Sequence, residues 1–260
     1  MSDEKVLTKE IAEQFLADED SVDLSEFTAI EDDAAVLLTT KYFFGLNLQG
    51  LTSLSDAAAA VLSFQRGDLC LDGLTGLSDT AAEFLSRHTG SVSLNGLTSA
   101  SESVADSLSL IEGDIEVYGL TDLPDTHGHF RLIEKLNEQE EVELGLTHLS
   151  DKAADILCRR DKEDGYINLH EVAELSDAAV ISLSQMKGGL SIGLISLSDA
   201  AAESLSKHQD YLSLSGLTVL SDAAAESLSR HKGALEIDLD ELPESATAIL
   251  RKHPSFADLD

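Results

Sequence analysis

The sequence predicts an α/β fold, a curved solenoid of about ten strand-turn-helix repeats with a parallel β-sheet on its concave face and helices on its convex face. Three observations predict this. A phrase close to G-L-T-x-L-S-D returns along the chain, mostly at intervals of 22 to 24 residues. A short segment of alternating leucines precedes each copy, and an alanine-rich run follows it. Units of this length cannot bury an apolar face alone, so neighbours stack into one continuous core.

The strand of each repeat is predicted from alternation. In the repeat at residues 212–233, Leu212, Leu214 and Leu217 are separated by polar residues that include Ser213 and Ser215. Apolar residues at every second position are typical of a short strand with one buried side. Successive strands are separated by a helix, so we expect them to pair in parallel.

The helix of each repeat follows from a capping signal and from a spacing of about four residues. Ser221 is the expected N-cap, and Asp222 is placed at the positive end of the helix dipole. Leu220, Ala224 and Leu228 lie on one helical side and are expected in the core.

The predicted domain organisation is one continuous domain. Residues 1–25 form an N-terminal capping helix and a first strand, residues 26–237 form the repeats, and residues 238–260 form a C-terminal repeat or cap. The repeats within 119–170 are longer and irregular, and insertions in a solenoid become surface loops that often bind.

The N-terminal cap is predicted in two parts. A helix is expected over Val6–Leu16 with Thr8 as its N-cap, and it closes a core that has no preceding repeat. Val22 and Leu24 are expected to form the first strand.

These repeats resemble the leucine-rich-repeat family, which combines a short L-x-L strand, about 20 to 29 residues per unit and a helix that returns the chain. The chain looks like an atypical, bacterial-type member of about 23 residues per repeat with the signature L-x-L-x-G-L-T-x-L-S-D, over residues 21–260. The resemblance implies a horseshoe that binds proteins. It departs from the family pattern where an Asn after the strand is replaced by a Gly before the third leucine, which suggests a tight backbone turn.

Charge distinguishes the two sides of the predicted array. The chain has 17 Lys and Arg against 49 Asp and Glu, a net charge of −32. The exposed strand positions carry no Lys or Arg, and they carry these acids: Asp23, Asp68, Asp72, Asp114, Glu116, Glu141, Glu143, Glu236 and Asp238. An acidic wall repels nucleic acid and attracts a basic partner. Solubility and divalent-ion binding by stacked carboxylates are alternative explanations of the same acids.

A partner-binding site is predicted where strand-face acids meet polar and aromatic side chains beside the irregular repeats. Tyrosine is a frequent interface anchor because it buries a rigid ring and still forms a hydrogen bond. The candidate residues are Asp114, Glu116, Tyr118, Glu141, Glu143, Tyr166, Asn168, His170 and Tyr211.

Histidines recur near the last turn of several predicted helices. We interpret each of them as interacting favourably with the negative end of its helix dipole: His88, His208, His231 and His253. A ladder of them is an alternative metal site, as are His127 and His129 in T-H-G-H-F. No nucleophile, phosphate-loop, dinucleotide or zinc-protease motif occurs. We therefore predict no catalytic residues, no metal and no cofactor.

The sequence indicates a general class of function, protein binding by a repeat scaffold, and does not identify the partner. The main hypothesis is a non-enzymatic scaffold that binds a basic protein on its acidic concave face. The alternative is an acidic mimic of nucleic acid that inhibits a DNA- or RNA-binding protein. An enzyme using the histidines and carboxylates of the middle repeats is a third option. We expect no direct contact with nucleic acid or membrane, a monomer with Cys70 and Cys158 as free thiols, and a cytoplasmic location.

Overall fold

The computed structural model describes residues 5–41, 45–161 and 163–257. The chain divides into two compact units. Unit 1 comprises Met1–Leu120 and Thr126–Leu136, and unit 2 comprises Thr121–Asp125 and Asn137–Asp260.

Unit 1 alternates strands with helices. Its helices are α1 (Lys9–Ala17), α2 (Asp32–Leu38), α3 (Asp56–Leu62), α4 (Asp79–Leu85), α5 (Glu102–Leu108) and α6 (His127–Leu136). Its strands are β1 (Val6–Leu7), β2 (Ala29–Ile30), β3 (Gly45–Asn47), β4 (Asp68–Cys70), β5 (Val92–Ser93) and β6 (Ile115–Glu116). Two 3-10 turns, η1 (Glu19–Ser21) and η2 (Leu24–Glu26), precede β2.

Unit 2 repeats the same alternation. Its helices are α7 (Asp151–Leu157), α8 (Asp177–Leu183), α9 (Asp199–Leu205), α10 (Asp222–Leu228) and α11 (Glu244–Leu250). Its strands are β7 (Glu141–Glu143), β8 (Tyr166–Leu169), β9 (Gly189–Ile192), β10 (Leu212–Ser213) and β11 (Leu235–Glu236). Two 3-10 turns, η3 (Leu239–Glu241) and η4 (Pro254–Phe256), flank α11.

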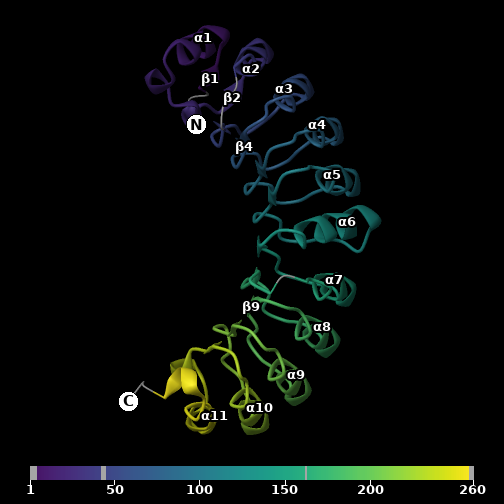
Figure 1. The fold of residues 1–260 in the computed structure, drawn as a ribbon, viewed down its shortest axis with the longest axis vertical. Helices are drawn as coiled ribbons and strands as arrows, with labels where there is room; N and C mark the ends of the chain where they lie inside the picture. The colour runs from purple at the N-terminus through teal and green to yellow at the C-terminus, as the bar shows by residue number, and fades with distance from the viewer. Residues whose placement is uncertain (1–4, 42–44, 162, 258–260) are drawn as a thin grey trace. The chain divides into compact units, whose positions relative to one another are not determined.

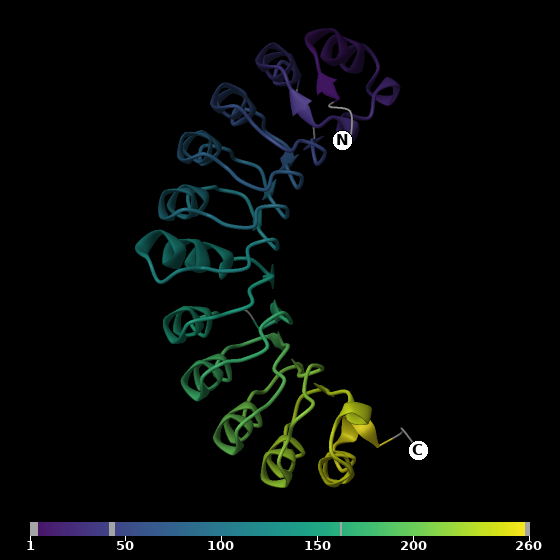
Figure 2. The ribbon, with the colours of Figure 1, turned by 180° about the vertical axis from the view of Figure 1, so that it is seen from behind.

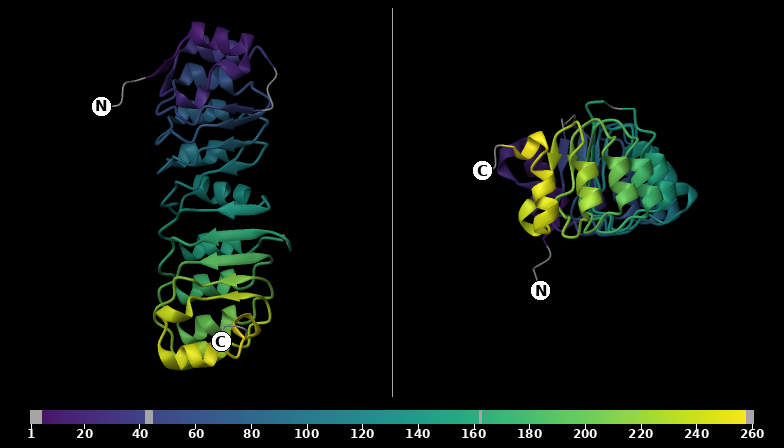
Figure 3. Two further views of the ribbon diagram at one scale, coloured as in Figure 1. Left: turned by 90° about the vertical axis from the view of Figure 1, so that its left-hand side faces the viewer. Right: turned by 90° about the horizontal axis from the view of Figure 1, so that it is seen from below.

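Within each unit the strands line one side and the helices line the other (Figures 1 and 2). Neighbouring strands pair in parallel, in the order β3-β4-β5-β6 in unit 1 and β7-β8-β9-β10-β11 in unit 2. The strands of unit 2 lie side by side and point the same way (Figure 3). These observations confirm the predicted α/β fold of stacked strand-turn-helix repeats. We call the exposed side of these strands the strand face.

The core of each repeat follows the predicted pattern. Leu212, Leu214 and Leu217 are fully buried, as are Ala224 and Leu228 on the facing side of α10. The helices share an A-A-x-x-L pattern whose alanines and leucine are buried. Because the alanine side chains are small, successive helices pack closely, and the leucines fill the space under the sheet. Ser221 caps α10 as predicted, because its hydroxyl oxygen accepts the Ala224 amide at 3.0 Å.

The glycine of the repeat phrase lies in a tight turn, as predicted, since the Leu97 amide donates to the Leu94 carbonyl at 2.9 Å across Gly96. Close contact between repeats explains why this residue is a glycine. A Cβ on Gly96 would lie 2.0 Å from the Asp72 carbonyl oxygen, and one on Gly216 would lie 2.5 Å from the Gly193 carbonyl oxygen. Neither glycine has a positive φ. The missing side chain therefore lets each repeat approach the backbone of the repeat before it.

The N-terminal prediction is partly wrong. Thr8 caps α1 as expected, since its hydroxyl accepts the Ile11 amide, but the strand expected at Val22 and Leu24 is replaced by a 3-10 turn. The Asp23 carboxylate accepts the Ser25 amide at 2.9 Å and the Ser25 hydroxyl at 2.6 Å, which closes this turn locally. The strand that pairs with the N-terminal segment is β2, through Val6 with Ala29.

Candidate functional site

The predicted site residues divide between the two units. Asp114, Glu116 and Tyr118 belong to unit 1, and the other six belong to unit 2.

In unit 1 a small polar network holds the candidate acid of β6. Glu116 Oε2 accepts hydrogen bonds from Ser93 Oγ at 3.1 Å and from Asn95 Nδ2 at 2.9 Å. The Asn95 side-chain oxygen in turn accepts the Tyr118 amide at 3.0 Å. Asp114 stands one residue before β6 and is exposed. The network fixes the Glu116 carboxylate on the strand face.

In unit 2 a second chain of polar contacts crosses β7 and β8. Asn168 Nδ2 donates to Glu143 Oε1 at 3.2 Å, and Asn168 Oδ1 accepts the His170 amide at 3.1 Å. The His170 ring contacts Asn168 Oδ1 through Nδ1 and Glu171 through Nε2, at 3.0 and 3.2 Å. The structure thus brings together three residues that the sequence analysis had grouped from their strand positions alone.

Two tyrosines of unit 2 form an aromatic pair on the strand face. The rings of Tyr166 and Tyr211 are 6.1 Å apart at an interplanar angle of 45°. Gly189 of β9 lies between them, because a Cβ there would stand 2.8 Å from Tyr166 Cδ2 and 3.5 Å from Tyr211 Cδ1. The glycine leaves the space that the two rings occupy.

Carboxylates flank this aromatic pair on both sides. Glu141 is the register partner of Tyr166, and the Tyr211 hydroxyl donates to Glu236 Oε2. Burial, together with this hydrogen bond, raises the pKa of Tyr211 to about 12. We call Glu141, Glu143, Tyr166, Tyr211 and Glu236 the acidic tyrosine face of unit 2.

Two contributors to this face were not predicted from the sequence. Glu236 was counted among the strand-face acids but was not linked to Tyr211, and Gly189 was not considered. The signal for Gly189 was present in the sequence, because it has only a hydrogen atom where the two neighbouring repeats have Tyr166 and Tyr211. Ser213 was expected to be exposed and is buried, and its hydroxyl contacts Tyr211.

Many other carboxylates serve contacts between repeats. In seven described repeats, the Ser that caps the helix donates to the Asp of the preceding repeat, and we call this series the Ser-Asp ladder. Its pairs are Ser55–Asp32, Ser78–Asp56, Ser101–Asp79, Ser150–Asp125, Ser176–Asp151, Ser198–Asp177 and Ser221–Asp199. Part of the acid content of the chain is therefore structural.

The histidines do not serve their own helix ends as interpreted from the sequence. His88 and His231 lie beyond the last helical turn, buried, and bind carbonyl oxygens of the preceding repeat: Gly67 at 2.9 Å and Asp210 at 3.0 Å. His129 contacts Thr126 through Nδ1 and the Ala100 carbonyl through Nε2. Burial lowers the pKa of His88 and His231, which favours neutral rings.

Metal and thiol chemistry can be assessed for the described residues. No three His, Cys, Asp or Glu side chains gather there as a metal site would require. Cys70 and Cys158 are free thiols, and burial raises the pKa of both. In the same part of the chain, no helix has the length and apolarity needed to cross a bilayer.

Comparison with known proteins bears on the fold. No protein-family model matches the chain, and no curated protein matches it. Among solved structures, an LRR protein of Leptospira interrogans superposes with a TM-score of 0.50 over 95% of this chain, at 17% sequence identity. The fold is leucine-rich-repeat-like. The chain spans 62% of the length of that leucine-rich-repeat protein, and at 17% identity the similarity is one of fold.

Proposed function

We propose that this leucine-rich-repeat-like chain is a non-enzymatic scaffold that binds a basic protein through the acidic tyrosine face of unit 2. The observation that carries the proposal is the Tyr166–Tyr211 pair across Gly189, with Glu141 and Glu236 beside it. Aromatic rings next to carboxylates suit an arginine, whose planar guanidinium stacks on a ring and pairs with carboxylate oxygens.

The distribution of cations supports the same proposal. In unit 2 the Lys and Arg side chains that form ion pairs lie away from the strand face, as in Arg159 with Asp155, Lys187 with Asp161 and Lys207 with Glu203. Among the described strand positions that carry these acids, none is occupied by Lys or Arg. A negative surface of this kind accelerates association with a basic partner.

The predicted residues of unit 1 form a second part of the proposal. Asp114, Glu116 and Tyr118 present two carboxylates and a ring on the strand face of their own unit. We propose that they contact the same partner. We also assign the chain to an atypical, bacterial-type leucine-rich repeat, in which Gly serves close approach and Ser-Asp serves the ladder.

The alternative, a nucleic-acid mimic, requires a regular row of free carboxylates. The strand-face row through Glu143 continues with Asn168, Ser191, Ser213 and Glu236, so its three middle positions are uncharged. This interruption favours the protein scaffold. A mimic would be displaced from its target by duplex DNA or RNA and would lose affinity steeply with salt.

Affinity capture from native cell extract tests the proposal. The wild type is compared with Glu141→Lys/Glu143→Lys, and Asp114→Lys/Glu116→Lys is run separately to test unit 1. The control is Glu226→Lys/Glu244→Lys, which makes the same charge change on exposed positions of α10 and α11.

The expected result is a basic protein retained by the wild type and the control at moderate salt, and lost by Glu141→Lys/Glu143→Lys. Equal capture by all variants would contradict the proposed face. Displacement of the captured protein by duplex DNA would favour the mimic instead.

Location and assembly complete the proposal. We propose a cytoplasmic monomer that needs no cofactor, since the two free cysteines suit a reducing compartment. Light scattering after size exclusion measures the mass directly, and a dimer would contradict this part.

A further inference from the structure

We propose that residues 253–256 form a pH-sensitive switch at the C-terminal end of unit 2, in which protonation of the buried His253 releases η4 and uncovers the outer edge of β11. β11 is the last strand in the sheet of unit 2. One of its edges pairs with β10, and no described strand pairs with the other.

Ser255 covers this outer edge by taking the place of a missing strand. Within the sheet the Leu212 amide donates to the Ala234 carbonyl oxygen of the next strand at 2.9 Å. Leu235 is the register partner of Leu212, and its amide donates instead to Ser255 Oγ at 3.0 Å. An edge amide left without such a partner is a template for pairing with another strand. Ser255 therefore closes the sheet.

His253 in turn holds Ser255 in place. Its Nδ1 accepts the Ser255 amide at 3.1 Å, which caps η4, and its Nε2 lies 2.9 Å from the His231 carbonyl oxygen. A backbone N–H can only donate, so Nδ1 must carry a lone pair, and the ring proton lies on Nε2. With both hydrogen bonds formed, His253 is neutral.

Protonation of His253 is incompatible with these contacts. A second ring proton on Nδ1 would point at the Ser255 N–H, so two donors would face each other and the cap of η4 would be lost. The ring is 1% exposed, and a buried charge without a new partner is costly. At the equivalent position of other repeats, Nδ1 of His88 and of His231 has no hydrogen-bond partner. His253 thus couples its charge to the main chain, which those two rings do not.

A stack of buried rings extends from His253 into the array. The His231 ring lies 6.1 Å from that of His253 and 6.2 Å from that of His208, at interplanar angles of 22° and 5°. The Phe256 ring of η4 covers the other side of His253 at 6.0 Å. Burial lowers the pKa of His231, and positive charge on either neighbouring ring lowers it further. Each proton that enters the stack therefore repels the next.

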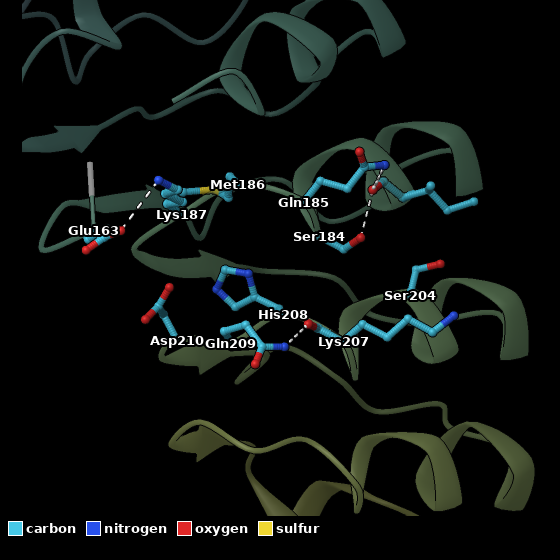
Figure 4. Close-up of a pocket in the computed structure, with 11 residues that line it drawn as sticks. Glu163, Ser184, Gln185, Met186, Lys187, Ser204, Lys207, His208, Gln209 and Asp210 are labelled. Atoms are coloured by element: carbon cyan, nitrogen blue, oxygen red, sulfur yellow. Dashed lines mark hydrogen bonds and ion pairs between the residues drawn. The ribbon is translucent and has the colours of Figure 1, made fainter. Parts of the chain in front are cut away.

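Cations surround the stack in the three loops that follow α9, α10 and α11: Lys207, Arg230, Lys232, Arg251 and Lys252. Figure 4 shows Lys207 and Asp210 together with His208 in the first of these loops.

The carboxylates on the same loops and on β11 already have partners. Asp210 accepts the Gly188 amide at 3.1 Å, and Glu236 accepts the Tyr211 hydroxyl. In the described part of the chain, no carboxylate forms an ion pair with a ring of the stack. Positive charge gained by the stack is therefore not compensated, and acid favours release of η4.

Amide hydrogen exchange of the full chain, followed by NMR at about pH 7.5 and about pH 5.5, tests the switch. Each measured rate is compared with the intrinsic rate at the same pH, which gives a protection factor. We expect the protection of the Leu235 amide to fall about tenfold, because opening adds one proton to an imidazole whose ordinary pKa is about 6.5. The Leu190 amide, bonded to the Tyr211 carbonyl oxygen at 2.9 Å, is the internal reference and should change less.

Three variants separate the steps of the switch. His253→Asn keeps a side-chain acceptor for the Ser255 amide and removes the titrating ring, so the protection of Leu235 should be equal at the two pH values. Ser255→Ala removes the acceptor of the Leu235 amide and should give low protection at both. His88→Gln removes a titrating ring from unit 1 and should leave the fall at Leu235 as in the wild type.

Four results would overturn the proposal. They are constant protection of Leu235 in the wild type, an equal fall at Leu190 and Leu235, an undiminished fall in His253→Asn, and unchanged protection of Leu235 in Ser255→Ala. The NMR shifts of the His253 ring nitrogens add a test that needs no variant. A cationic His253 with Leu235 still protected at the lower pH would overturn the proposal as well.

Discussion

Ser78 Oγ lies 2.5 Å from Asp56 Oδ1 and joins the first turn of α4 to the first turn of α3. The same hydroxyl oxygen accepts the Ala81 amide at 2.9 Å. One serine therefore caps its own helix and binds the helix before it. This double role of the serine explains why the S-D dipeptide recurs along the sequence.

Removing the Asp56 carboxylate is expected to destabilise the chain. Asp56→Ala should lower the free energy of unfolding by about 1 kcal/mol, because the bond from Ser78 ends at an ionised group on an exposed edge. Ser78→Ala should cost about 2 kcal/mol, since it also removes the N-cap. Urea unfolding of both single variants and the double variant measures the coupling.

Asp222 provides the matched control for this experiment. It occupies the same place in α10, but Pro243 stands where the next repeat would supply a serine hydroxyl. Asp222→Ala therefore removes the favourable charge at a helix start without breaking a ladder bond. Equal losses for Asp56→Ala and Asp222→Ala would show that the ladder contributes nothing to stability.

Gly96 should not tolerate a side chain. A Cβ there would stand 2.0 Å from the Asp72 carbonyl oxygen, so Gly96→Ala must displace one repeat from its neighbour. We expect a loss of about 2 kcal/mol or more in the free energy of unfolding. Gly76→Ala is the control, because no atom lies within 4 Å of its Cβ position, and thermal unfolding should show little change or a gain.

The buried histidines predict a dependence of stability on pH. Burial lowers the pKa of His88 and His231 in the folded chain, so the unfolded chain binds more protons. Their contribution to stability is fully present above the unfolded pKa and is lost as pH falls toward the folded pKa. Between about pH 7.5 and pH 5.5, the Tm of the wild type should fall relative to that of a non-titrating variant.

Glutamine is the substitution that makes this comparison clean. Gln65 stands at the position of His88 one repeat earlier and is buried, so the array already accepts glutamine there. His88→Gln/His231→Gln keeps a donor for the carbonyls of Gly67 and Asp210 without a titrating ring. A constant difference in Tm across this pH range would contradict the prediction.

Tyr211 should ionise later than an ordinary tyrosine. Its pKa is raised to about 12, by burial and by the bond to Glu236, so its stabilising effect is complete below pH 10 and is lost as pH rises toward 12. NMR titration of the tyrosine Cζ signals measures this. Glu236→Gln should lower the pKa of Tyr211 in part, because burial remains, and an unchanged value would contradict a role for the carboxylate.

Most of the fold could be predicted because the repeat determines it locally. The alternation at Leu212 and Leu214 gives the strand, and Ser221 with Ala224 and Leu228 gives the helix. The segment at Val22 and Leu24 could not be predicted in the same way. Val22 and Leu24 alternate as in a strand, but the Asp23 side chain caps a 3-10 turn, which hydrophobic periodicity does not predict.

The site could be predicted only in outline. Side-chain alternation placed Tyr166, Asn168 and His170 on one surface, but the Tyr166–Tyr211 contact depends on Gly189, a repeat between them. The carbonyl partner of a histidine also lies in the preceding repeat, as Gly67 does for His88. Contacts across repeats are decided by geometry that a single repeat does not encode.

The Ser-Asp ladder also bears on how such a chain can change in length. Each link joins one serine to one aspartate a single repeat earlier, as in Ser198–Asp177 and Ser221–Asp199. A tandem duplication of one repeat would supply a new donor on one side and a new acceptor on the other. Recombination can therefore add or remove whole repeats while every junction keeps a Ser-Asp hydrogen bond. Duplication of only part of a repeat would lose this hydrogen bond at its junction.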